Sequence, residues 1–174
     1  MSSTPPPPRL RPAYNADERS QLTGWLEMQR AVIHWKCEGL SEEDAHRPVL
    51  PSSPLMSLAG LVSHMRWVEH LWFEVIFLGG PEAGPRVDSE EEDADMRVDG
   101  VPLTRLLDEY RRQCATSDEI IAAHGLDQAG RHPDFKASAA SLRWILFHMI
   151  EETARHAGHA DALRELLDGD TGYY

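Results

Sequence analysis

Hydrophobic residues recur at intervals of three and four along four long stretches of the chain, which is the pattern of amphipathic helices. These stretches run from about Ala16 to Glu38, Ser57 to Leu78, Pro102 to His124 and Ser138 to Leu167. No stretch shows the alternation of apolar and polar residues that indicates a β-strand. Four helices, each with one apolar stripe, predict an all-α protein built as a four-helix bundle.

Residues between these stretches carry the signals of helix ends and loops. Asn15 or Asp17 can cap the first helix, and Gly39 can end it. A short capped turn is expected at 41–44. The connection 81–101 is strongly acidic, and we expect such a charge run to be a solvated loop. The charge run itself consists of Asp88, Glu90, Glu91, Glu92, Asp93 and Asp95.

The two ends of the chain do not continue the helical pattern. Residues 1–14 contain a run of four prolines, and proline lacks the backbone N–H that a helix needs. We therefore divide the chain into a disordered, proline-rich tail at 1–14, a helical domain at 15–168 and a short C-terminal tail at 169–174.

Composition narrows the class of protein. The chain has 174 residues, with 29 acidic residues against 17 Lys and Arg, and a net charge of −12. This charge argues against nucleic acid as a partner, which needs a basic footprint, and disfavours an anionic membrane surface. No apolar run approaches the ~18 residues of a membrane span, and the N-terminus has no apolar signal-peptide core. Two cysteines are too few for a disulfide framework, so we expect a cytoplasmic protein.

Polar side chains interrupt the apolar stripes at a few positions. His64 lies on the stripe of the second helix, and Glu152, His156 and His159 lie on that of the fourth. A buried ionised carboxylate costs several kcal/mol unless it is paired or bound to a cation. Glu152 therefore needs a partner inside the bundle.

A divalent metal is the partner that these residue types suggest. Glu152 and His156 are four residues apart, so their side chains leave one helix face a turn apart. His64 can face the same layer from the second helix. Two imidazoles and one carboxylate suit zinc and also accept nickel or iron(II). Three protein ligands leave a coordination position open, which favours a catalytic over a structural site.

Spacing alone leaves other interpretations open. A single His on an apolar stripe is commonly a hydrogen-bonded core residue, and a Glu–His pair can be a simple salt link. His159 could be a ligand, a proton shuttle or a residue that supports a ligand, and His148 could be a fourth ligand. Asp161 or Glu151 could accept a hydrogen bond from a ligating imidazole. Cys114 is expected to be a small core residue, with a nucleophilic role as the weaker alternative.

The segment LRWILFHMIEETARHAGHAD, residues 142–161, resembles the fourth-helix signature of the DinB-like superfamily. The similarity is to its actinobacterial branch, once labelled mini-circle proteins. The segments WLEMQR at 25–30 and SLAGLVSHM at 57–65 also look like that branch. The resemblance extends over about residues 16–167.

This resemblance implies a four-helix bundle that holds one divalent metal between its second and fourth helices. The family's ligand positions match His64, Glu152 and His156. Many members have His where this chain has Glu152, whereas a related mycothiol-dependent maleylpyruvate isomerase has Glu. Relatives are often homodimers, and Trp67, Trp72 or Phe73 could form such a contact or belong to the core.

Characterised relatives are often enzymes that use mycothiol, bacillithiol or glutathione. A free thiol has a pKa of about 8.5, and a metal that binds it removes its proton. The resemblance therefore implies a metal-dependent enzyme that activates mycothiol for S-transfer to, or isomerisation of, a small electrophile. Two alternatives are a metal-water hydrolase of a small amide or ester, with His159 as base, and a non-catalytic metal- or ligand-binding dimer.

Overall fold

The computed structural model describes residues 8–91, 93–133 and 139–172, and within them it contains helices and no strand. The prediction of an all-α protein is therefore confirmed. The long helical segments are α1 (Glu18–Lys36), α3 (Leu58–Glu69) with its continuation η1 (His70–Phe77), α5 (Leu103–Ala123) and α6 (Leu142–Asp168). The short ones are α2 (Glu42–His46), α4 (Pro85–Asp88) and η2 (Ala94–Met96).

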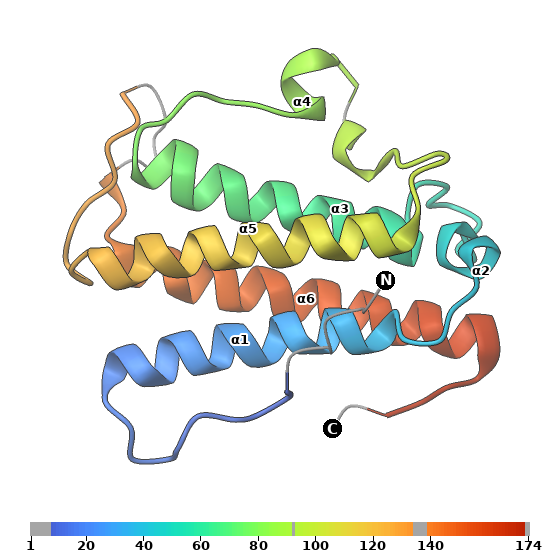
Figure 1. Cartoon of the computed structure of the whole chain (residues 1–174), viewed down its shortest axis with the longest axis horizontal. Coiled ribbons are helices and arrows are strands. Elements are labelled where there is room, and N and C mark those ends of the chain that lie inside the picture. The colour runs from blue at the N-terminus through green and yellow to red at the C-terminus, as the bar shows by residue number, and fades with distance from the viewer. Residues whose placement is uncertain (1–7, 92, 134–138, 173–174) are drawn as a thin grey trace.

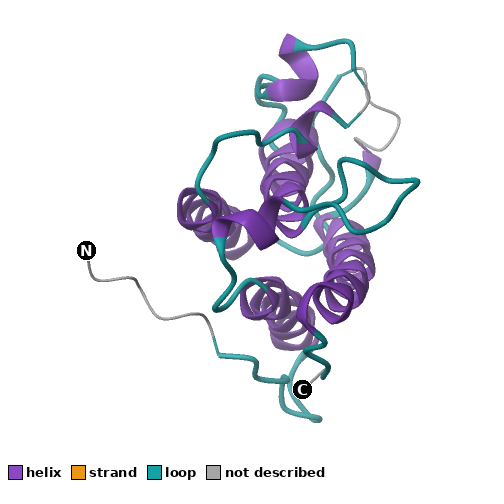
Figure 2. Ribbon diagram, turned by 90° about the vertical axis from the view of Figure 1, so that its right-hand side faces the viewer, coloured by secondary structure: helices purple, strands orange, loops and turns teal. Residues whose placement is uncertain are grey.

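The long helices lie side by side around a common interior, as Figure 1 and the end-on view of Figure 2 show. Helix α1 packs against α6, and α3 packs against both α5 and α6. The connection from η1 to α5 passes over α3 and carries α4 and η2 (Figure 1). The long helices therefore pack around a shared interior, as expected for a bundle.

Local sequence sets several helix ends. The side chain of Asp17, rather than Asn15, caps α1 by accepting a hydrogen bond from the Ser20 backbone N–H. Ser57 and Ser141 cap α3 and α6 in the same way. The start predicted for the fourth helix, Ser138, lies outside the described residues. Helix α6 itself begins at Leu142, directly after its cap.

The second helix differs from its prediction in its last third. Residues His70–Phe77 form a π-helix, in which the Leu78 N–H donates to the Phe73 carbonyl at 3.2 Å. Each π turn contains more residues than an α turn, so the buried stripe shifts around the helix. Phe73 and Phe77 are buried, whereas Leu71 and Leu78, which continue the stripe of His64 at intervals of three and four, are only partly buried.

Two apolar residues that continue the stripes, each three residues after a buried leucine, lie outside the core. Trp25 of α1 is 37% exposed and Leu166 of α6 is 58% exposed. A stripe that recurs at intervals of three and four has an average repeat of 3.5 residues. A straight α-helix drifts by about 20° per heptad from such a repeat. In the 27-residue helix α6, the fully buried face consequently passes through Thr153, Ala157 and Ala160.

The acidic connection is only partly the solvated loop that we expected. Asp88, Glu90, Glu91 and Asp93 are exposed, and Glu92 lies outside the described residues. The three residues of η2, Ala94, Asp95 and Met96, are buried against α3. The prediction is wrong for this turn, because apolar neighbours on both sides of Asp95 carry it into the core.

A buried ion pair joins the long helices near the middle of the bundle. Arg30 of α1 donates from Nε and Nη2 to the two carboxylate oxygens of Glu69, at 2.8 and 2.7 Å. Glu69 is fully buried, and Arg30 also contacts Asp118 of α5 at 2.7 Å. Three helices therefore share one network of charges.

Only part of each chain end belongs to the described structure. Residues 1–7 and 173–174 lie outside the described residues, so disorder of the tails stays a prediction. The Arg9 guanidinium lies 3.7 Å from the centre of the Trp35 ring. Within the described ranges, no helix is both long enough and apolar enough to cross a membrane.

The Glu69→Gln variant should lose about 3 kcal/mol of unfolding free energy, because it leaves the buried Arg30 without its main counter-charge. Urea denaturation at neutral pH measures this change. Glu18→Gln is the matched control, since Glu18 pairs with Arg143 at the surface and should contribute little. Equal effects of the two substitutions would contradict the structural role of the buried pair.

Stability should also fall as the pH drops from about 6.5 to about 4. Burial, aided by Arg111, lowers the pKa of His34 to about 4. The unfolded chain, with an ordinary His pKa, therefore binds a proton in this window that the folded chain resists. His34→Phe keeps a ring against Tyr110 and should flatten the pH dependence of the urea midpoint between pH 4 and 6.5. Parallel curves for the two proteins would rule His34 out as its source.

Candidate metal centre

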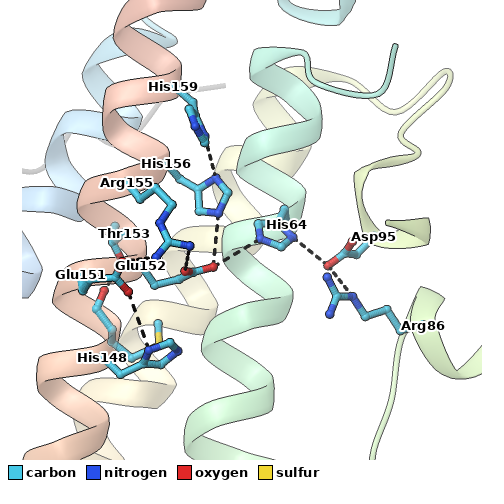
Figure 3. Close-up of polar contacts among 11 residues, drawn as sticks. His64, Arg86, Asp95, His148, Glu151, Glu152, Thr153, Arg155, His156 and His159 are labelled. Atoms are coloured by element: carbon cyan, nitrogen blue, oxygen red, sulfur yellow. Dashed lines mark hydrogen bonds and ion pairs between the residues drawn. The ribbon is translucent and has the colours of Figure 1, made fainter. Parts of the chain in front are cut away.

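Three side chains from α3 and α6 meet at one point between these helices (Figure 3). The Nε2 atoms of His64 and His156 lie 3.8 and 3.3 Å from Oε1 of Glu152. The two imidazole rings approach edge to face, with their centres 4.7 Å apart. One nitrogen or oxygen of each residue lies within 4.8 Å of those of the other two. The structure therefore brings together the three residues singled out in the sequence.

Asp95 supports His64 from the side opposite Glu152 (Figure 3). His64 Nδ1 lies 3.0 Å from Asp95 Oδ2, and Arg86 Nε reaches the same oxygen at 3.0 Å. A carboxylate only accepts, so Nδ1 carries the hydrogen and Nε2 presents its lone pair to Glu152 and His156. Burial raises the pKa of Asp95, but His64 and Arg86 outweigh burial and hold it below its ordinary value.

A glycine lets Asp95 reach this position. A Cβ on Gly60 would lie 2.7 Å from the Leu55 carbonyl oxygen and 3.0 Å from that of Met96. No other residue would therefore fit at this point of α3 without displacing backbone. The absence of a side chain allows η2 to pack closely on α3 and to place Asp95 beside His64.

The environment of His156 favours its neutral form. Burial and the neighbouring His64 and His159 lower the pKa of His156, and the Glu152 carboxylate opposes them. The neutral imidazole is the form that binds metals. Nδ1 of His159 lies 3.4 Å from Nδ1 of His156, so His159 can accept a hydrogen bond when Nε2 of His156 is engaged. This contact fits a supporting role or a proton path for His159, and both remain predictions.

The acceptors suggested from the sequence have other partners. Asp161 pairs with Lys36 Nζ at 2.8 Å, and Glu151 pairs with Arg155. The prediction that Asp161 or Glu151 accepts a hydrogen bond from the ligating imidazole is therefore wrong for His64, whose acceptor is Asp95. The sequence feature that could have identified Asp95 is its place between two apolar residues, Ala94 and Met96, inside an otherwise exposed acidic run.

Other candidate residues lie outside the group. His148 stacks near Trp72 and Trp144, with ring centres 4.3 and 5.4 Å away, and it is not part of any metal-competent cluster among the described residues. Trp144 is 49% exposed. Burial raises the pKa of the Cys114 thiol well above its ordinary value, which fits a core residue rather than a nucleophile.

The donor set fits a small divalent ion. Ligand atoms about 2.0–2.1 Å from a tetrahedral zinc lie about 3.3 Å from one another. The 3.3 and 3.8 Å separations around Glu152 Oε1 are close to that value. Two nitrogens and one oxygen would hold the ion, and a fourth position would be free for a second molecule.

Comparison with known proteins gives one match. A family model described as mycothiol-S-transferase matches residues 21–169, a range that includes His64, Glu152, His156 and Asp95. No curated protein and no solved structure matches the chain.

Asp95→Asn should weaken metal binding about 10–100-fold, because the amide no longer provides the charged acceptor that orients His64. Competition against a coloured zinc chelator measures the affinity. Asp93→Asn is the matched control: Asp93 is exposed, two residues away, and at a φ of 58° that Asn tolerates. Equal affinities of the two variants would show that Asp95 does not act on the site.

Proposed function

The chain belongs to the mycothiol-S-transferase family, and we propose that it is a divalent-metal-dependent enzyme that activates mycothiol for transfer of its sulfur to a small electrophile. Thiol-assisted isomerisation of the electrophile is the other form of the same chemistry. The observation that carries this proposal is the meeting of His64, Glu152 and His156 within 4.8 Å, inside the part of the chain that matches the family.

We propose that these three residues hold one divalent ion, with zinc expected and nickel or iron(II) as alternatives. When bound, such an ion would supply the Lewis acidity that lowers the pKa of a coordinated thiol. The chain's own residues prepare that site. Asp95 fixes the hydrogen of His64, and Glu152 adds one negative charge, which moderates the acidity of the ion relative to a three-histidine set.

The state of the protein's cysteines supports a thiol brought from outside. Burial raises the pKa of Cys37 to about 12 and that of Cys114 well above its ordinary value. Both are buried, and neither forms a disulfide. Neither side chain supplies a thiolate at neutral pH, so the sulfur nucleophile has to come from a small molecule.

His159 is our candidate for handling the proton that the thiol gives up. It contacts His156 and is only partly buried, so it connects the group to solvent. Histidine is the side chain that most often serves as a proton shuttle in proteins. In the hydrolytic alternative the same residue would act as base on water.

We also propose a cytoplasmic homodimer. Two unpaired cysteines fit a reducing compartment. Of the residues considered for the dimer contact, Phe73 is fully buried in the core and cannot take part, whereas Trp67 and Trp72 are partly buried. The neighbouring Trp144 and Phe147, which are 49% and 58% exposed on α6, offer a better aromatic surface.

Purified protein from cells grown with zinc and nickel should retain about one metal ion per chain by elemental analysis. Glu152→Gln, His64→Ala and His156→Ala should lose that metal and, with it, the mycothiol-dependent depletion of a panel of electrophiles. Glu151→Gln is the matched control for Glu152→Gln, since the adjacent carboxylate lies outside the group.

The same assay separates the alternatives. Turnover of esters or amides that does not need mycothiol would indicate a hydrolase. A metal-loaded protein without turnover of any electrophile would indicate a binding protein. Wild-type protein without metal would refute the proposed site.

A further inference from the structure

A cavity of about 200 Å³ lies on the side of α3 covered by the segment that carries α4. Its apolar wall includes Trp67, Val68, Leu71, Val75 and Pro85. Four polar or charged residues also line the cavity: His70, Glu82, Arg86 and Asp95. Figure 1 shows the α4 segment arching over α3, so this enclosure depends on the tertiary path of the chain.

The cover of the cavity is closely fitted. Gly84, directly before α4, has a φ of 100°, which a side chain rarely permits. A Cβ there would lie 2.4 Å from the Trp67 ring. The segment can therefore pass this close to Trp67 only because residue 84 is glycine.

Two wall residues carry a buried polar atom without a hydrogen-bond partner among the described residues: Oδ1 of Asp95 and Nε2 of His70. Asp95 is 1% exposed, and its other oxygen already receives His64 and Arg86. His70 Nδ1 lies 3.0 Å from a carboxylate oxygen of Glu74, and a carboxylate only accepts, so Nδ1 carries a hydrogen; in this tautomer Nε2 is an acceptor.

Unpartnered buried polar atoms are rare in native proteins and indicate a missing water, ion or ligand. Both atoms here are acceptors, so the missing group is a donor. An apolar cavity of about 150 Å³ accepts benzene. A cavity of about 200 Å³ therefore has room for an apolar body of that size with one additional polar group.

We propose that this cavity is a binding site for a small, uncharged molecule with an apolar or aromatic body and a hydroxyl group that donates to Asp95 or His70. The site is separate from the group His64, Glu152 and His156, although Asp95 lines the cavity and also contacts His64. A thiol much larger than a cysteine would not fit inside it. The proposal does not require sulfur transfer, because it concerns binding alone.

Benzyl alcohol and ethylbenzene are suitable probes, since they have the same number of non-hydrogen atoms and differ in the hydroxyl group. Each is titrated into the full-length protein while the Trp67 indole and His70 ring resonances are followed by NMR. Benzyl alcohol should produce saturable shifts and bind about tenfold more tightly than ethylbenzene, because a hydrogen bond to a charged acceptor favours it. The titration is made with metal-free and with zinc-loaded protein.

Two substitutions from different walls should abolish the shifts by filling the cavity: Leu71→Trp on η1 and Ala83→Phe on the covering segment. Ala122→Phe, at an exposed alanine of α5 away from the cavity, is the control and should bind like wild type. Thermal unfolding of each variant shows whether it is folded. Ala83 is exposed, so its substitution is the one expected to preserve the fold.

The outcomes separate this site from the proposed enzyme. Benzyl alcohol binding that Ala83→Phe removes supports the cavity site even in a protein that shows no thiol transfer. Equal binding of the two probes would overturn recognition of a donor. Absence of any shift in the wild-type protein, metal-free or zinc-loaded, would show a cavity that holds only water and would overturn the proposal.

Discussion

Helix α3 is buried on almost every side, because α2, α5, α6 and η2 all pack against it. A polar side chain on such a helix has no access to bulk water and must find its partner within the protein. Glu69 does so with Arg30, and His64 does so with Asp95 through Nδ1. The fold and the candidate site thus follow from the same requirement, that buried charge be compensated.

The distribution of thiols and imidazoles explains why the chemistry would depend on an external sulfur. Burial raises the pKa of both cysteines, so the chain contains no reactive thiol. Around His156, burial acts in the opposite sense and favours the neutral, metal-binding form. Desolvation therefore keeps both cysteine thiols protonated and keeps the His156 imidazole neutral, the form that can bind a cation.

The connection between η1 and α5 has a larger role than its acidic sequence suggested. Its exposed residues account for much of the negative charge, whereas its buried turn η2 supplies Asp95. Gly60 on α3 and Gly84 before α4 permit the close approaches that bring this segment into place. One crossing segment consequently supports His64 and also covers the neighbouring cavity.

Helical periodicity was sufficient to predict four long helices, and the sequence also singled out His64, Glu152 and His156. The Asp17 cap acts over three residues, and Glu152 and His156 are related by one helical turn, so local spacing was sufficient for these features. The place of His64 in the same group rested on its apolar stripe and on the family resemblance. Three features depend on how the helices pack: the π-helix at His70–Phe77, the pairing of Glu69 with Arg30, and the support of His64 by Asp95 rather than Asp161. These contacts join residues 31 or more positions apart, or depend on how neighbouring helices pack, and helical periodicity contains no information about such distances.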